Sequence, residues 1–168
     1  MEEYVHTQIG RADLGELIPF AQVRVADGRA VGSTSCHNMR FLPREPDPFA
    51  VEIGWTWLGA SAQRTGINTE AKLLLMGHAF ETWCVARVVL KTDARNERSR
   101  SAIEGLGARF EGVLRSWQPS LATGEEGRFR DSAIFSILVS EWPATGVRLR
   151  ERLSRRAVET EADYGPIL

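Results

Sequence analysis

The chain has 168 residues, a formal net charge of −1, 43% hydrophobic residues and 26% charged residues. This balance predicts a single folded domain and gives no electrostatic reason to expect a nucleic-acid partner. The sequence also lacks an apolar run near the roughly 20 residues that cross a bilayer, a signal-peptide pattern, and enough cysteines for a disulfide framework. We therefore expect a cytoplasmic protein with reduced thiols and no membrane partner.

The N-terminal part predicts a short helix followed by a hairpin. Residues 14–20 favour a helix that ends at Pro19. Residues 21–36 predict a hairpin, because Ala21, Val23 and Val25 alternate with polar residues and Asp27-Gly28 is a strong turn pair. A proline-rich loop is expected next.

Residues 49–58 form the clearest predicted strand, because apolar and polar side chains alternate along them. The alternation places Glu52, Gly54, Thr56 and Leu58 on one face. The opposite, apolar face consists of Phe49, Val51, Ile53, Trp55 and Trp57.

A helix and a second strand follow this strand. Residues 68–84 have helical spacing, with Asn68 or Thr69 as the N-cap, and residues 85–92 form a short apolar strand. A strand, a helix and a strand in succession predict a crossover and a parallel pair. The expected buried stripe of the helix is Ala71, Leu74, Leu75, His78 and Ala79.

The second half predicts four more elements. Residues 96–107 favour a helix with Asn96 as N-cap, and residues 108–115 and 131–139 favour strands. Residues 145–159 have the pattern of a charged C-terminal helix.

Together these elements predict an α/β (α+β) fold with a mixed, partly antiparallel sheet flanked by helices. We expect one domain over residues 1–145, followed by a C-terminal helix and tail over residues 146–168.

The loop between the predicted strand and helix carries the clearest chemical signal. Free backbone N–H groups and the positive end of the helix dipole make such a loop a good phosphate site. Gly66 permits close approach to the backbone or a positive φ, and Arg64 could add a charge-assisted contact. A plain connecting loop is the alternative interpretation.

Several motifs in order resemble the GNAT superfamily of N-acetyltransferases, in its RimJ/RimL-like branch. The acyl-CoA signature of this family, Gln/Arg-x-x-Gly-x-Gly/Ala, is matched at Gln63 and Gly66, with Asn68 where Gly or Ala is usual. The resemblance covers roughly residues 18 to 142. Its flanking matches are EIGWTWL, TEA, DARNERSRSAIEGLGARFEGVLR and RDSAIFSIL.

The resemblance implies acetyl-CoA as co-substrate and a GNAT-like fold. The diphosphate of acetyl-CoA would lie on the backbone N–H groups of the loop from Arg64 to Thr69. The pantetheine would run along the end of the predicted strand, near Trp57 and Leu58. No metal is expected, since the three histidines lack metal-ligand spacing. The implied cofactor-binding residues are Trp57, Leu58, Gln63, Arg64, Thr65, Gly66, Ile67, Asn68, Thr69, Asn96 and Ser99.

The resemblance also implies direct attack of an amine on the thioester, with a backbone N–H polarising the carbonyl. Ser99 would act as the acid and Asn96 would assist it, although both could serve only to cap a helix. Glu52 is a candidate base, with Asp131 or a water relay as alternatives. Gln118 stands where ribosomal-type relatives often have a glutamate, and it cannot accept the proton.

GNAT domains usually begin with a strand and one or two helices before the hairpin, whereas about 18 residues precede it here. Three explanations are open: the chain starts late in the domain, a partner subunit completes the site, or the side of the cleft that binds the acceptor amine is open. An uncovered sheet edge would also favour a homodimer. The expected function is transfer of an acetyl group to a primary amine, on a small molecule or a protein N-terminus. The alternatives are a catalytically weak or inactive module that binds acyl-CoA or a partner, and a structural subunit.

Overall fold

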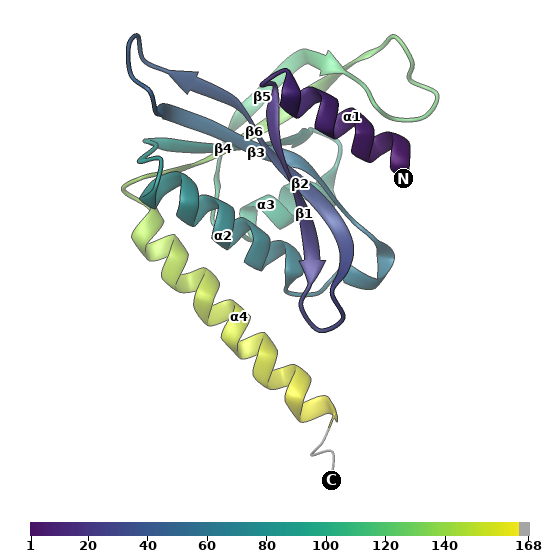
Figure 1. Ribbon diagram of the computed structural model, residues 1–168, viewed down its shortest axis with the longest axis vertical. Coiled ribbons are helices and arrows are strands. Elements are labelled where there is room, and N and C mark those ends of the chain that lie inside the picture. The colour runs from purple at the N-terminus through teal and green to yellow at the C-terminus, as the bar shows by residue number, and fades with distance from the viewer. Residues whose placement is uncertain (165–168) are drawn as a thin grey trace.

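The computed structural model describes residues 1–164, and the side chains of residues 1–156. Four α-helices and a six-stranded sheet make up the fold (Figure 1). In chain order the elements are α1 (Glu2–Asp13), β1 (Leu17–Arg24), β2 (Arg29–Phe41), β3 (Pro48–Leu58), the 3-10 turn η1 (Ala60–Ala62), α2 (Ile67–Glu81), β4 (Arg87–Asp93), α3 (Glu97–Glu104), β5 (Arg109–Pro119), β6 (Phe129–Leu138) and α4 (Trp142–Tyr164).

The sheet confirms the predicted mixed topology. Its strand order is β1-β2-β3-β4-β6-β5, and every neighbouring pair is antiparallel except β3 and β4. The crossover between these two strands is α2, as the strand–helix–strand pattern predicts. The hairpin is formed by β1 and β2, with Asp27 and Gly28 in its turn.

The core lies between one face of the sheet and three helices, α2, α3 and α4. Alternate residues of the strands contribute to it, which is why the apolar pattern predicted the strands well. On the other face, α1 lies near β1 and β2, and its Tyr4 hydroxyl contacts Ser33 Oγ at 3.3 Å. The largest fully buried core side chains include Phe135, Ile53, Met76, Ile137 and Leu149.

The helix predicted over residues 14–20 is wrong. The helix in this region is α1, which ends before Gly15, a residue with a φ of +71° that turns the chain. Leu17 then begins β1 and is buried. Because β1 is an edge strand, it accommodates Pro19 without losing a hydrogen bond in the sheet interior.

A β-bulge interrupts β3. Ser35 of β2 pairs with Gly54, and Ser33 pairs with Trp57, so β3 has one residue more than β2 between these two pairs. Trp55 lies within the bulge and has a φ of +51°. The strict alternation predicted for residues 49–58 therefore fails at this point.

The bulge exchanges the two faces of β3. Ile53 lies in the core as predicted. Beyond the bulge, Thr56 faces Lys72 of α2, whereas Trp57 packs edge-on against Tyr4 of α1 at a ring separation of 5.7 Å. The apolar face predicted for Trp57 is thus wrong, because one extra residue reverses all later side chains.

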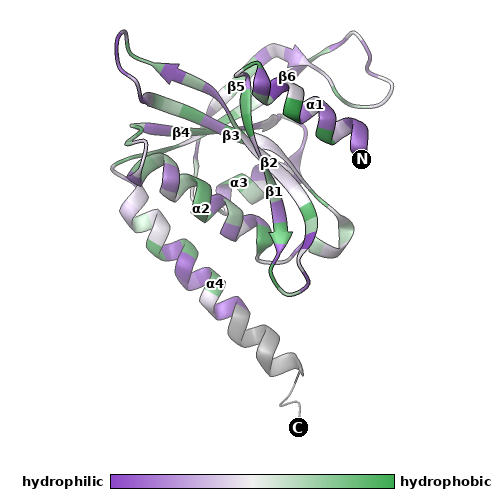
Figure 2. Cartoon of the chain, in the orientation of Figure 1, coloured by the Kyte–Doolittle hydropathy of each residue, from purple (hydrophilic) through white to green (hydrophobic). Residues whose placement is uncertain are grey.

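The buried side of α2 also differs from the predicted stripe. Leu74 is 67% exposed, whereas Lys72 is only 3% exposed. Apolar residues occur all around this helix, so hydrophobic spacing does not identify its buried side (Figure 2). The buried residues are Thr69, Lys72, Met76, Ala79 and Phe80.

The C-terminal helix is longer than predicted and belongs to the core. It begins at Trp142, so the division drawn at residue 145 falls inside α4, and its Leu149 is fully buried. Residues 165–168 of the predicted tail lie outside the described residues. Among the helices that the structure describes, none is both long and apolar enough to cross a membrane.

Candidate active site

A cleft opens where β3 and β4 separate. The two parallel strands pair at only three positions, which join Ala50 to Arg87, Val51 to Val88 and Glu52 to Val89. Beyond these pairs each strand continues without the other, which leaves a cleft of about 610 Å³ lined by both strands, the loop before α2, α3 and α4. Backbone groups of β3 that face this gap are available to a bound molecule.

The loop before α2 has the geometry of an anion site. The N-cap of α2 is Gly66, which has no side chain to cap the helix, although the Thr65 hydroxyl accepts the N–H of Ile67 at 3.3 Å. The first N–H bonded within this helix is that of Glu70, to the carbonyl of Gly66 at 2.9 Å. The earlier N–H groups lack helical acceptors and lie at the positive end of the dipole. Arg64, with a φ of +62°, supplies the turn, whereas Gly66 has an ordinary helical φ of −72°.

Gly66 instead packs closely against α4. A Cβ at this position would lie 3.3 Å from Leu153 Cδ2 of α4. Gln63 fixes the same loop, because its Nε2 donates to the carbonyl of Leu58 at 3.0 Å and its Oε1 accepts from Arg98 at 2.8 Å. The loop is thus held between β3, α3 and α4.

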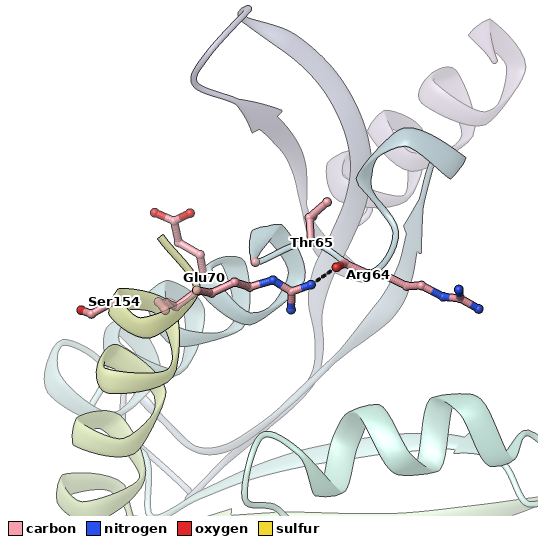
Figure 3. Close-up of a pocket in the computed structure, with 7 residues that line it drawn as sticks. Arg64, Thr65, Glu70 and Ser154 are labelled. Carbon is pink, nitrogen blue, oxygen red and sulfur yellow. Dashed lines mark hydrogen bonds between the residues drawn. The ribbon is translucent and has the colours of Figure 1, made fainter. Parts of the chain in front are cut away.

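Most of the residues predicted to bind acetyl-CoA lie together. The cleft is lined by Trp57, Leu58, Gln63, Arg64, Thr65, Asn68, Thr69, Asn96 and Ser99. Gly66 lines an adjacent cavity of about 660 Å³ on the α4 side of the loop (Figure 3), and Ile67 is not among the lining residues of either cavity. These positions are brought together by the fold from four separate elements.

The lining of the cleft is strongly cationic. Within the described part of the chain it includes no Asp or Glu. Such a surface attracts an anionic ligand even though the whole chain has a net charge of −1. The basic residues that line it are Arg64, Lys72, Lys91, Arg98, Arg130, Arg152 and Arg156.

Ser99 and Asn96 meet at the start of α3. Asn96 is the N-cap, as predicted, and its side chain accepts the backbone N–H of Ser99 at 3.0 Å. Ser99 is half-buried and lines the cleft in the first turn of the helix. Asn96 therefore fixes the backbone from which the Ser99 hydroxyl projects.

Glu52 is buried on the opposite side of β3 from Ile53 and does not line the cleft. Its oxygens contact His37 Nε2 at 3.1 Å, Asn38 Nδ2 at 2.9 Å and Lys91 Nζ at 3.2 Å. Burial disfavours the charged form, but these partners outweigh burial and lower the pKa of Glu52 to about 2. A carboxylate with so low a pKa is a weak proton acceptor near neutral pH.

The other base candidate, Asp131, has a structural contact. Its Oδ1 accepts the backbone N–H of Ser116 at 2.8 Å, at a point where β5 departs from regular pairing with β6. Gln118 lies further along β5 and pairs with Arg130.

Sequence patterns did not indicate Lys72 as a cleft residue. Its Nζ donates to Thr34 Oγ1 at 2.6 Å and to Thr56 Oγ1 at 2.7 Å. Burial lowers the pKa of Lys72 to about 7, although the nearby Cys36 thiol opposes this shift. A lysine in the middle of an otherwise apolar helix segment is the signal that could have identified it.

The amino-acid sequence matches the family described as the acetyltransferase (GNAT) domain over residues 2–109. The chain belongs to this family. The separated strands β3 and β4 and the loop before α2 therefore belong to a GNAT domain.

Known relatives of this GNAT domain agree in sequence and fold. It is 31% identical over 116 residues to the Bacillus subtilis (strain 168) protein named "Putative ribosomal N-acetyltransferase YdaF", covering 69% of this chain and 57% of that one. A GCN5-related N-acetyltransferase from Brucella melitensis is 28% identical with a TM-score of 0.77, covering 91% and 65% of the two chains. Mycobacterium smegmatis RimJ in complex with CoA-disulfide is 23% identical with a TM-score of 0.69, covering 92% and 68%.

The chain thus spans 57% of the curated relative and about two thirds of these solved structures. The RimJ structure, at 23% identity, supports the fold alone.

The cleft of this GNAT domain suits acetyl-CoA in its charge and its hydrogen-bonding groups. At one end of the cleft, the N–H groups at the start of α2 and the arginines suit phosphates. At the other end, the edge of β3 that is not paired with β4 suits the amide groups of the pantetheine arm. Asn68 Oδ1 is buried there without a hydrogen-bond partner among the described residues, so a donor on the ligand could satisfy it. The described residues contain no cluster of three or more His, Cys, Asp or Glu that could hold a metal.

Proposed function

We propose that this chain is an N-acetyltransferase that transfers the acetyl group of acetyl-CoA to a primary amine by direct attack. The observation that carries the proposal is the cationic cleft between the separated strands β3 and β4, which continues into the uncapped start of α2. As the acceptor class we propose the α-amino group of a protein N-terminus. The name of the B. subtilis relative, a ribosomal N-acetyltransferase, supports this choice. A cytoplasmic location and a homodimer stay predictions.

Binding of acetyl-CoA would use the two ends of the cleft differently. The backbone N–H groups between Arg64 and Thr69 would hold the diphosphate, assisted by the Arg64 guanidinium. The edge of β3 up to Trp57 and Leu58 would hydrogen-bond the pantetheine arm. This arrangement would bring the thioester towards the bulge at Trp55, which lies beyond the last pair between β3 and β4, Glu52 with Val89.

The chemistry proposed at the bulge requires no enzyme nucleophile. The unprotonated amine attacks the thioester carbonyl, and a backbone N–H of the β3 bulge stabilises the oxyanion. The C–S bond then breaks, and we propose that the Ser99 hydroxyl donates a proton to the departing thiolate. Asn96 acts as a positioning residue, because it holds the backbone N–H of Ser99. The proton lost by the amine passes to water, and water returns a proton to the Ser99 oxygen.

We propose a supporting role for Glu52 in place of direct proton transfer. Its low pKa and its three partners keep it ionised. Lys91 lines the cleft, and its ammonium group contacts the Glu52 carboxylate. This contact would hold the Lys91 side chain in place. Glu52 therefore contributes by holding the end of the cleft in place.

Calorimetric titration with acetyl-CoA tests the proposal. We expect the parent to bind and Gly66→Trp to lose binding, because the added side chain would collide with Leu153 of α4. Gly10→Trp is a suitable control, since no atom lies within 4 Å of a Cβ built there. Release of CoA thiol is then measured with peptides bearing a free or a blocked N-terminus, and with small amines.

The two measurements separate the levels of the proposal. No binding of acetyl-CoA by the folded parent would refute the acetyltransferase function. Binding followed by thiol release with small amines, but with no peptide, would refute the protein N-terminus as acceptor. Dependence of thiol release on a free peptide N-terminus would support both.

A further inference from the structure

A lysine side chain lies at the inner wall of the cleft, between α2 and the sheet. Lys72 belongs to the buried side of α2 and is 3% exposed, yet it is among the residues that line the cleft. Its Nζ contacts two hydroxyl groups, Thr34 Oγ1 of β2 at 2.6 Å and Thr56 Oγ1 of β3 at 2.7 Å. Thr34 is buried, whereas Thr56 is exposed and lines the cleft. The amino group of Lys72 therefore lies where the packed interior meets the open cleft.

The surroundings of Lys72 favour an unprotonated amine. Burial lowers the pKa of Lys72 to about 7, although the nearby Cys36 thiol of β2 opposes this shift. The two groups that the nitrogen contacts are neutral hydroxyls. Glu70 of the same helix is exposed and only two residues away, so the two side chains do not face each other.

The other lysine of the chain, Lys91, has a different environment. It also lines the cleft, but its Nζ contacts the Glu52 carboxylate at 3.2 Å. A desolvated, neutral lysine amine is a nucleophile, whereas an ammonium group in an ion pair has no lone pair for attack. Of the two lysines, Lys72 is therefore the one suited to react with an acyl group.

The Lys72 amino group also lies beside the proposed position of the thioester. In the proposed function the pantetheine follows Trp57 and Leu58, and the thioester lies towards the bulge at Trp55. Thr56 stands between these positions in β3, and its hydroxyl faces Lys72. One hydrogen bond thus separates the Lys72 nitrogen from the part of the strand that the thioester would follow.

We propose that Lys72 is a site of self-acetylation, to which the chain transfers the acetyl group of bound acetyl-CoA when no acceptor amine is present. The inference rests on the proposed function, since it requires acetyl-CoA in the cleft. The neutral Lys72 nitrogen attacks the thioester carbonyl carbon, so that a C–N bond forms and the C–S bond breaks. The proton lost by the nitrogen passes to the departing thiolate, and the products are acetyl-lysine and CoA. The new amide is uncharged, so the cleft loses one basic group.

Mass spectrometry tests the modification in the absence of any acceptor amine. The parent is incubated with acetyl-CoA at about pH 8, where about nine tenths of Lys72 but under about 1% of an exposed lysine is unprotonated. Peptide mapping then locates each added acetyl group. We expect acetylation of Lys72 and none of Lys91. Lys72→Met, which lacks the nucleophile, should gain no acetyl group at this site.

Arg29→Lys is the matched control for reaction with free acetyl-CoA. It adds a lysine at an exposed position at the start of β2, outside the residues that line the cleft. We expect Lys72 to be acetylated about 100-fold faster than position 29, from the difference in unprotonated fraction. Gly66→Trp, which should lose acetyl-CoA, should also lose the acetylation of Lys72.

The outcomes separate this inference from the proposed function. Equal rates of acetylation at Lys72 and position 29 would overturn the inference, because they would show reaction without the cleft. Acetylation of Lys72 at the parental rate in folded Gly66→Trp that binds no acetyl-CoA would overturn it as well. Calorimetric binding of acetyl-CoA by the parent with Lys72 left unmodified would overturn the inference alone. If the folded parent binds no acetyl-CoA, the proposed function and the inference both fail.

Discussion

The buried charge of Lys72 gives a sharp test of the energetics of the cleft. Lys72 is 3% exposed, and its pKa is lowered by burial from 10.5 to about 7. We consider the variant Lys72→Met, which has a similar length and no charge. Thr34 and Thr56 keep a hydrogen bond with each other at 2.9 Å, so their hydroxyl groups are not left without partners.

The direction of the effect follows from proton binding. The unfolded chain holds the Lys72 proton up to about pH 10.5, whereas the folded chain releases it above about pH 7. The unfolding free energy of the parent should therefore rise between these two values, by at most about 1.4 kcal/mol per pH unit and by about 5 kcal/mol in total. Lys72→Met lacks this rise. Near pH 7 we expect the variant to be more stable by about 2 kcal/mol, after allowing for the two lost hydrogen bonds.

Urea unfolding at several pH values between 7 and 10 measures this difference, with the fluorescence of the five tryptophans as the signal. Lys91→Met is the matched control, because Lys72 and Lys91 are the only lysines of the chain and this variant retains Lys72. The control should keep the rise with pH. Parallel curves for the parent and Lys72→Met would refute the reasoning, since they would show that burial does not shift the Lys72 pKa.

Four further variants test the start of α3 and the Glu52 contacts. Asn96→Ala should lower the unfolding free energy by about 1 kcal/mol in urea, and Asn96→Ser should retain most of it, because serine also caps helices. The ionised form of Glu52 stabilises the fold above its ordinary pKa of 4.5, and this contribution is lost as the pH falls towards 2. The unfolding free energy of the parent should therefore fall by about 3 kcal/mol over this pH range, as followed by circular dichroism. Glu52→Gln should lack this fall. Ser99→Ala should lower kcat about 100-fold and leave the dissociation constant of acetyl-CoA unchanged.

Each of these predictions has an outcome that would contradict it. Equal losses in Asn96→Ala and Asn96→Ser would mean that the side chain does not act as a cap. Identical acid unfolding profiles for the parent and Glu52→Gln would remove the case for a strongly ionised carboxylate. A weaker affinity for acetyl-CoA in Ser99→Ala, with kcat unchanged, would assign the hydroxyl to binding alone.

Local patterns were sufficient for the elements that position the loop. The strand over residues 49–58, the helix after it and the parallel strand follow from alternation, helical spacing and order along the chain. The N-cap at Asn96 is equally local, because the cap and the N–H that it accepts are three residues apart. Such features depend on residues that are close in sequence, so individual residue types are enough to predict them.

Features that depend on distant partners could not be predicted in the same way. The bulge at Trp55 is defined by the pairing of β3 with β2. Gly54 beside it is a residue type that often marks a bulge, but it does not fix the position of the extra residue. The buried position of Lys72 requires Thr34, which lies 38 residues away. Arg156 reaches the loop from 92 residues away, so its place at the cleft depends on how α4 packs on the core.

The charge of the site shows why bulk composition was a poor guide to the ligand. A net charge of −1 spread evenly would give no attraction for acetyl-CoA. The fold instead places basic residues together around the cleft. The separation of β3 and β4 leaves a gap that α2, α3 and α4 surround, and each of these helices or its preceding loop contributes a cation. The acidic residues are placed elsewhere, many of them in ion pairs such as Arg95 with Glu125 and Arg11 with Glu16. Anion binding here therefore arises from the arrangement of charges in space, which the total charge of the chain does not record.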